Sequence, residues 1–263
     1  MKRRFRKMHG LGNDFVIFDA REAPVEMTEE RARALADRRT GIGCDQLIVL
    51  EPSDEADVRM RIWNSDGGEA ESCGNAARCV ALLLGGPAWI ETAGGLIAAS
   101  AKGSSATVDM GEPRFGWDEI PLAYPMDTAE MPVGWEDLRD PYAVNVGNPH
   151  IVFFVEDANA VEIERLGPLI EHDPLFPQRV NVNIASIEEG GIRLRVWERG
   201  AGLTQACGTG ACATAVAAVS RGLAASPVQV RLPGGSLTIA WTPGTTIAMS
   251  GPATAVFEGE VAL

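Results

Sequence analysis

The sequence contains no apolar run long enough to cross a membrane, and its basic first residues, MKRRFRKMHG, are not followed by the apolar segment of a signal peptide. It is also short of positive charge. The 23 lysines and arginines face 36 acidic residues, which gives a net charge of −13. Such an acidic chain is not expected to bind nucleic acid or an anionic membrane surface. We therefore predict neither kind of partner.

Patterns that hold metals or disulfides are missing as well. The five cysteines include no C-x-x-C pair, their number is odd, and the three histidines are scattered along the chain. We expect no metal site, and we expect thiols that stay reduced in the cytoplasm. The length of 263 residues allows one large domain or two domains of about 130 residues each.

The sequence does contain an internal duplication. Residues 59–74 (RMRIWNSDGGEAESCG) and 192–208 (IRLRVWERGAGLTQACG) each place a tryptophan ten positions before a Cys-Gly pair. Two further landmarks recur at an offset of 135. These are residues 12–18 (GNDFVIF) with 147–153 (GNPHIVF), and Gln46 with Asn181. Because the four landmarks keep their order, we predict two homologous halves related by pseudo-twofold symmetry.

Each Cys-Gly pair opens a segment that is apolar almost all round. Residues 74–84 carry one charge and residues 208–219 carry none, so each segment is expected to be a buried helix at the centre of its half. Short β-rich runs bounded by Gly, Pro and Asp supply the strands around these helices. The predicted fold class is therefore α/β (α+β), with strands wrapped around a central apolar helix in each half.

The proposed halves are residues 1–116, which carry Cys73, and residues 117–263, which carry Cys207. Whether the last strand-like segment, 254–263, packs on the first half is left open. A further helix is expected over 28–38, where Thr28 can cap it. The proline-rich segment 112–142 is predicted to be an irregular connector.

Cys73 and Cys207 are the strongest candidates for chemistry. At the start of a buried helix, unpaired N–H groups favour a thiolate and should lower the thiol pKa below about 8.5. The N–H groups that follow each cysteine can also bind a carboxylate. Two opposed thiols can remove a proton from one face of a carbon and return one to the other. The remaining cysteines are expected to be buried and inert, and they are Cys44, Cys79 and Cys212.

Several blocks carry a family resemblance. They are MHGLGNDFVIFD (8–19), GIGCDQLIVLE (41–51), NSDGGEAESCGNAARC (64–79), VNVGNPHIVF (144–153), RVNVNI (179–184) and WERGAGLTQACGTGACA (197–213). In order and spacing the sequence closely resembles the diaminopimelate epimerases. The resemblance implies a cofactor-independent isomerase that interconverts LL- and meso-2,6-diaminopimelate in the synthesis of lysine and peptidoglycan precursors. It also implies a homodimer and the fold of that family.

The resemblance carries roles over to individual residues. Cys73 and Cys207 would be the two acid/base groups, with Cys207 as the thiolate base and Cys73 as the acid in the LL-to-meso direction. His150 and Glu198 match positions that modulate the cysteine pKa values. The matching positions for the reacting carboxylate are Gly74, Asn75, Gly208 and Thr209. Those for the rest of the substrate are Asn13, Gln46, Asn64, Asn148, Asn181, Glu198 and Arg199.

Two other functions remain open at this point. A proline or hydroxyproline racemase of the same fold would share the cysteine pair but would not need Glu198, Arg199 and the amide side chains. A non-catalytic redox sensor would use the two thiols to form a disulfide. Turnover of a substrate separates the enzyme from the sensor. Leu203 and the pair Ala76-Ala77 depart from the family pattern, and neither departure falls on a matched catalytic residue.

Overall fold

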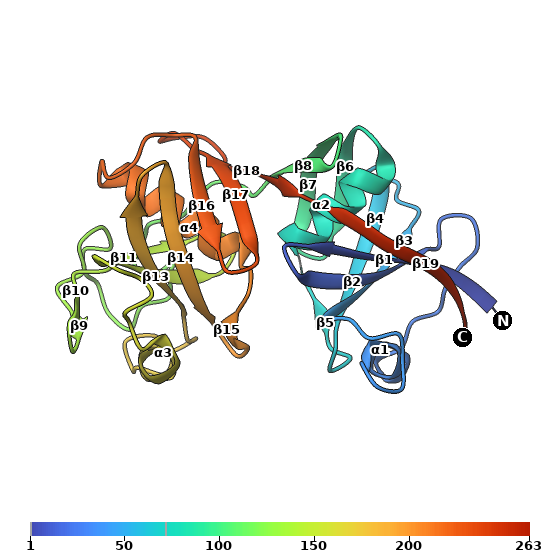
Figure 1. The fold of residues 1–263 in the computed structure, drawn as a ribbon, viewed down its shortest axis with the longest axis horizontal. Coiled ribbons are helices and arrows are strands. Elements are labelled where there is room, and N and C mark those ends of the chain that lie inside the picture. The colour runs from blue at the N-terminus through green and yellow to red at the C-terminus, as the bar shows by residue number, and fades with distance from the viewer. Residues whose placement is uncertain (1, 72) are drawn as a thin grey trace. The chain divides into compact units, whose positions relative to one another are not determined.

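The computed structural model describes residues 2–71 and 73–263 (Figure 1). Contacts divide the chain into a first unit, Met1–Val108 with Gly251–Leu263, and a second unit, Asp109–Ser250. This division differs from the proposed boundary between 116 and 117. Backbone hydrogen bonds between residues 110–111 and Ile247 tie the former to the second unit. At the other end, the last strand pairs with the first strand of the chain.

The described part of the first unit contains eight consecutive strands and, from the end of the chain, the strand β19, which pairs with β1. The strands are β1 (Lys2–Gly10), β2 (Asn13–Asp19), β3 (Gln46–Glu51), β4 (Val58–Asn64), β5 (Glu69–Ala70), β6 (Pro87–Thr92), β7 (Gly95–Lys102), β8 (Ser105–Asp109) and β19 (Thr254–Ala262). The helices are α1 (Glu29–Ala36) and α2 (Gly74–Leu84). β2 and β3 are parallel, and β4 pairs antiparallel with β3 and parallel with β6.

The second unit repeats this arrangement. Its strands are β9 (Gly134–Trp135), β10 (Leu138–Arg139), β11 (Tyr142–Asn145), β12 (Pro149–Phe154), β13 (Asn181–Glu188), β14 (Gly191–Glu198), β15 (Gly202–Thr204), β16 (Val228–Leu232), β17 (Gly235–Ala240) and β18 (Ala248–Pro252). Its helices are α3 (Ile163–Glu171) and α4 (Gly208–Ser220). β12 and β13 are parallel, and β14 pairs antiparallel with β13 and parallel with β16.

The strand register confirms that the two halves are repeats of one design. Phe15 pairs with Gln46 in the first unit, and His150 pairs with Asn181 in the second, each at the offset of 135 seen in the sequence. Among the described residues of both units, the shared order of parallel and antiparallel pairings extends from the β2–β3 pair through the β6–β7 pair and its counterpart, β16–β17.

The two central helices are confirmed, and each begins after a cysteine that caps it. α2 packs on β1, β6 and β7, and α4 packs on β11 to β14 and on β16 and β17. α2 ends at Gly85, whose φ of 78° is in the left-handed region that suits glycine. α4 is buried along nearly its whole length, as its apolar sequence requires. The helix expected over 28–38 is shorter, Glu29–Ala36, and Thr28 caps it.

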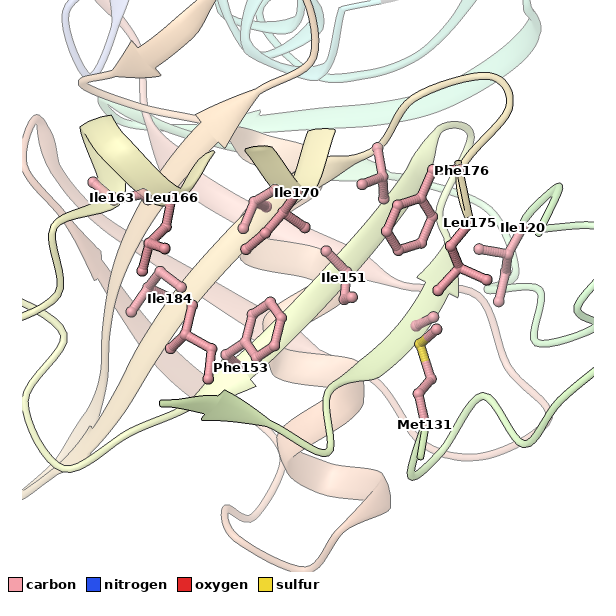
Figure 2. Close-up of a cluster of buried hydrophobic side chains, with 14 of the residues drawn as sticks. Ile120, Met131, Ile151, Phe153, Ile163, Leu166, Ile170, Leu175, Phe176 and Ile184 are labelled. Atoms are coloured by element: carbon pink, nitrogen blue, oxygen red, sulfur yellow. The ribbon is translucent and has the colours of Figure 1, made fainter. Parts of the chain in front are cut away.

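A further helix, α3, was not predicted from the sequence. Its Ile163, Leu166 and Ile170 pack on Ile151 and Ile184 of β12 and β13, as Figure 2 shows. The helix contains the pair Gly167-Pro168, which disfavours a helix on propensity alone. The glycine is needed because a Cβ atom there would lie 2.5 Å from Trp197 Cγ. Burial of an apolar face against the sheet therefore outweighs the poor propensity.

The proline-rich segment contributes to the same core. Ile120 and Met131 lie in the buried cluster that also contains side chains of α3, β12 and β13 (Figure 2), and Leu138 belongs to the same cluster. Residues of this segment also form the small β9–β10 hairpin. The connector is thus largely irregular, and it forms one wall of the second unit as well. Among the described residues, no helix is both long and apolar enough to span a membrane.

Candidate active site

The predicted residues of the first unit meet at one edge of its strands. Asn13 begins β2, Gln46 begins the parallel neighbour β3, and Asn64 ends the antiparallel neighbour β4. Parallel strands that begin together and an antiparallel strand that ends beside them bring these side chains to the same edge. α2 begins with Gly74, and Asn75 joins the group through a hydrogen bond from its Nδ2 to Asn13 Oδ1 at 3.1 Å.

Two side-chain amide oxygens in this group accept no hydrogen bond in the described structure. Gln46 donates through Nε2 to Asn64 Oδ1 at 2.9 Å, and Asn75 donates through Nδ2 to Asn13. Gln46 Oε1 and Asn75 Oδ1 are buried, and neither has a hydrogen-bond partner in the described structure. A buried acceptor without a donor is costly. The pair therefore suits a ligand that brings N–H groups.

A network of charged side chains that the sequence did not predict is hydrogen-bonded to Asn13. Asp45 Oδ2 accepts from Asn13 Nδ2 at 3.0 Å, and Arg38 donates to Asp45 Oδ1 at 2.6 Å. Arg38 also pairs with Asp14 at 2.7 Å, and Lys7 pairs with Asp14 as well. Burial favours a raised pKa for Asp14, but its hydrogen bonds from Arg38 and Lys7 outweigh burial and hold that pKa well below the usual range. The only sequence signal was the position of Asp45 directly before Gln46.

Cys73 occupies the N-cap of α2. Its backbone is extended, with φ −152° and ψ 108°, and its Sγ accepts from the Ala76 N–H at 3.5 Å. The residue is half-buried. Cys79, inside the same helix, is fully buried, and burial raises its thiol pKa to about 12. The contrast singles out Cys73 as the thiol of this helix that is open to chemistry.

The second unit builds the equivalent edge with different side chains. Asn148 precedes β12, Asn181 begins β13 and Glu198 ends β14. Asn181 is buried, donates through Nδ2 to Pro149 O at 2.9 Å and accepts from the Arg199 backbone N–H at 2.9 Å. Asn181 therefore holds the backbone at Arg199 in place. Both the nitrogen and the oxygen of its side-chain amide are hydrogen-bonded to the protein.

A buried carboxylate shapes the turn after β14. Glu171, at the end of α3, accepts from Trp197 Nε1 at 2.8 Å and from the Gly200 N–H at 2.9 Å. These bonds hold the turn that carries Glu198 and Arg199. The Arg199 side chain is exposed and donates to Gln178 O at 3.0 Å. Because a guanidinium has five N–H donors, it can still receive a carboxylate in a forked geometry.

Cys207 occupies the N-cap of α4 and is only 3% exposed. Its Sγ accepts from the Gly210 N–H at 3.4 Å and lies 3.5 Å from Thr209 Oγ1. Cys207 also shares a hydrogen bond with the Glu198 side chain. The Thr204 hydroxyl donates to Oε1 of the same glutamate. Glu198 is therefore the carboxylate in contact with this thiol.

The expectation of a lowered thiol pKa is wrong for Cys207. Burial raises its pKa well above the ordinary value, and the neighbouring Glu198 carboxylate adds to the rise, while the bonds from Thr209 and Gly210 oppose it. Burial also raises the pKa of Glu198. The helix start does stabilise the thiolate, as expected, but desolvation and a nearby negative charge have the larger effect.

His150 lies between two amide side chains and is fully buried. Its Nε2 lies 2.8 Å from Asn148 Oδ1 and its Nδ1 lies 3.1 Å from Asn183 Nδ2. Burial lowers its pKa to about 3, so the ring is neutral near pH 7. Its role as a modulator of the cysteine pKa stays a prediction. Asn183 was not among the predicted residues, and nothing in its local sequence marks it.

The fold is shared with proteins of known structure. A hydroxyproline epimerase from Agrobacterium vitis superposes with a TM-score of 0.67 at 17% identity, over 100% of this chain and 93% of that one. A PhzF-family phenazine biosynthesis protein from Bacillus anthracis superposes with a TM-score of 0.71 at 16% identity, over the whole of both chains. At these identities the likeness concerns the fold alone. The chain therefore has the α+β fold of these two proteins.

Sequence comparison identifies the family of the chain within this fold. The sequence model of diaminopimelate epimerase matches residues 5–116 and 142–256. A diaminopimelate epimerase of Sphingopyxis alaskensis is 66% identical over 261 residues, which are 99% of this chain and 97% of that protein. The chain therefore belongs to the diaminopimelate epimerase family, and it is an isomerase.

Proposed function

We propose that the protein interconverts LL- and meso-2,6-diaminopimelate, with Cys73 and Cys207 as the two acid/base groups. The observation that carries the proposal is the placement of both thiols as N-caps of the central helices, at equivalent positions of the two repeats. Family membership over nearly the whole chain supports the substrate. The place of the reaction is then the synthesis of lysine and peptidoglycan precursors.

The proton balance of the reaction follows from the two thiols. In the LL-to-meso direction, the Cys207 thiolate takes the Cα proton and the Cys73 thiol delivers its proton to the opposite face of the same carbon. Cys207 is then a thiol and Cys73 a thiolate, which is the state needed for the reverse reaction. Glu198 shares a hydrogen bond with Cys207 and is placed to accept the Cys207 proton when the thiolate forms.

Backbone N–H groups at both helix starts supply the electrostatic part of the mechanism. Those of Gly74 and Asn75, and of Gly208 and Thr209, are proposed to bind the reacting carboxylate. They then stabilise the negative charge that grows there as Cα loses its proton. The proposed chemistry uses one thiol from each unit.

The second amino acid head of diaminopimelate requires its own recognition. Arg199 is suited to its carboxylate, and Asn64, Asn148 and Asn181 to further polar contacts. The buried amide oxygens of Gln46 and Asn75 are suited to N–H groups of the ligand, because both lack a donor in the described structure. Proline and hydroxyproline have no second head, so this set of polar groups favours diaminopimelate over them.

The test is proton NMR of LL-diaminopimelate in D₂O with the reduced protein. We expect conversion to the meso isomer with deuterium at Cα. Cys73→Ala and Cys207→Ala should each lose epimerisation almost completely. Cys79→Ala and Cys212→Ala, which make the same change inside α2 and α4, should keep it. Conversion of proline but not of diaminopimelate would move the protein to the racemases, and turnover of neither by the reduced protein would favour a redox sensor.

The family resemblance further supports a homodimer in the cytoplasm. Light scattering of the purified protein after size-exclusion chromatography should give twice the mass of 28.0 kDa. A monomer at micromolar concentration would contradict the homodimer without affecting the proposed chemistry.

A further inference from the structure

We propose that Asn183 is a positioning residue that sets the tautomer of His150 and, through it, turns the N–H end of the Asn148 side chain toward substrate. The inference rests on the proposed function only in treating Asn148 as a substrate contact. Three side chains of the second unit form the chain of bonds, from Asn183 to His150 to Asn148.

The orientation of the Asn183 amide is fixed by backbone carbonyls. Asn183 is fully buried, and its Nδ2 lies 3.0 Å from Ile151 O and 3.3 Å from Asn181 O. A carbonyl oxygen can only accept, so the nitrogen and not the oxygen of the amide faces these groups. The oxygen lies against the first turn of α4, where a Cβ on Gly210 would be 2.7 Å from it. Rotation of the amide would oppose like charges at the two carbonyls.

The tautomer of His150 follows from that orientation. Asn183 Nδ2 cannot accept, so a proton on His150 Nδ1, at 3.1 Å, would face a donor, and Nδ1 therefore carries no proton. The ring is fully buried and neutral, so its one proton is on Nε2. Nε2 therefore donates to the atom of Asn148 at 2.8 Å, which must be the carbonyl oxygen Oδ1.

The orientation of Asn148 is the outcome that matters for binding. With Oδ1 taken by His150, the Nδ2 end of this half-buried amide is turned away from the ring. It can offer only donors. The amino acid substrate has ammonium groups, which cannot accept, and carboxylates, which can. Asn148 is thus set to recognise a carboxylate oxygen.

The first unit has no such device at the equivalent positions. Phe15 takes the place of His150 and Ile48 that of Asn183, at the offset of 135. Asn13, the counterpart of Asn148, is held instead by Asp45, which accepts from its Nδ2, and by Asn75, which donates to its Oδ1. The two repeats therefore hold equivalent asparagines by different partners, one through a neutral relay of His150 and Asn183 and the other through a carboxylate and an amide.

The first arm of the test is ¹⁵N NMR of the histidine rings in the unmodified, substrate-free protein near pH 7.5. The His150 signals are assigned by their loss in His150→Gln. We expect the proton on Nε2, and a proton on Nδ1 would overturn the proposal. Because no substrate is present, this result is independent of the proposed activity.

The second arm changes the donor into an acceptor. In Asn183→Asp the carboxylate should draw the ring proton to Nδ1, so that Nε2 accepts from Asn148 and the amide turns over. We expect KM for diaminopimelate to rise by about tenfold or more, since a hydrogen bond to a charged group is lost. We expect kcat to change by less than about threefold, because the contact is made equally before and during the reaction.

Asn183→Leu removes the donor at similar size and should also raise KM, which keeps the test open if the aspartate does not fold. Asn159→Asp, the same change at an exposed position of the second unit, should alter neither the tautomer nor KM. A shifted tautomer in Asn183→Asp with an unchanged KM would refute the positioning role, as would a KM raised in Asn159→Asp to the same extent.

Discussion

The neutral, buried His150 makes the second unit less stable in mild acid, and His150→Gln should remove that effect. Burial lowers the pKa of His150 from 6.5 to about 3 in the folded protein. In the unfolded chain the ring binds a proton once the pH falls below about 6.5. The unfolded state therefore holds more protons between these two values, and stability falls as the pH decreases through this window. Glutamine has no titrating group and can still donate to Asn148 from a position near that of Nε2.

The size of the effect follows from the two pKa values. Between pH 7.5 and 5.5 a single group of this kind costs the wild type about 1.4 kcal/mol relative to a non-titrating variant. Above pH 7.5 both forms of His150 are neutral, and the difference between the two proteins should be constant. The window stops at pH 5.5 because the sequence pI is about 4.7, where a protein of low net charge tends to precipitate.

Urea unfolding at pH 5.5, 6.5, 7.5 and 8.5 checks this expectation. Fluorine-labelled tryptophan allows the second unit to be followed separately, since Trp135 stacks on Phe176 in its core at a centroid distance of 6.0 Å. The reasoning is refuted if the stability difference between wild type and His150→Gln is the same at pH 5.5 as at pH 7.5. A difference that moves in the opposite direction would mean that His150 is charged in the folded protein.

The other predictions concern the start of α4. Glu198→Gln should lower the Cys207 pKa, because a neighbouring negative charge is removed while burial remains. The pH dependence of Cys207 alkylation, followed by mass spectrometry, measures this pKa. An unchanged or higher pKa would contradict the coupling between the two residues. Gly210→Ala should destabilise the protein by ~1–3 kcal/mol, because the new Cβ would meet Asn183 Oδ1 at 2.7 Å. Gly86→Ala, where no atom lies within 4 Å of the new Cβ, should be nearly neutral in the same denaturation experiment.

The sequence predicted those features whose signal is local or repeated. An all-apolar segment after a Cys-Gly pair indicates a buried helix with a cysteine cap, and both such helices begin where expected, at Gly74 and Gly208. The offset of 135 also predicted register, because a duplicated strand pair must repeat its partners. Gln46 and Asn181 occupy equivalent positions for this reason.

Features that depend on tertiary contacts were missed. α3 contains Gly167 and Pro168, and only its contact with the β14 tryptophan explains the glycine. Asp45 and Glu171 are acidic residues among 36, and their hydrogen bonds to Asn13 and to the turn after β14 depend on how distant segments come together. No pattern in one sequence distinguishes them from surface charges.

The wrong expectation for the Cys207 pKa has the same origin. A helix start can be recognised from a few neighbouring residues, so the stabilising N–H groups were foreseen. The degree of burial and the presence of Glu198 beside the sulfur are set by the packing of α4 on its strands. The N–H groups of the helix start lower the Cys207 pKa, as the sequence predicts. Desolvation raises the same pKa by more, so the net shift is upward.

A duplication preserves backbone pairing more strictly than side-chain chemistry, and the two units show why this matters for an epimerase. Each repeat keeps an asparagine at the start of its second strand and a cysteine before its central helix. Yet Asp45 in one repeat corresponds to buried Val180 in the other, so a different group orients the asparagine in each half. A substrate with a chiral centre does not present the same groups to both sides. Asn13 and Asn148 occupy equivalent positions and are nevertheless held by unlike partners, Asn13 by Asp45 and Asn75, and Asn148 by His150.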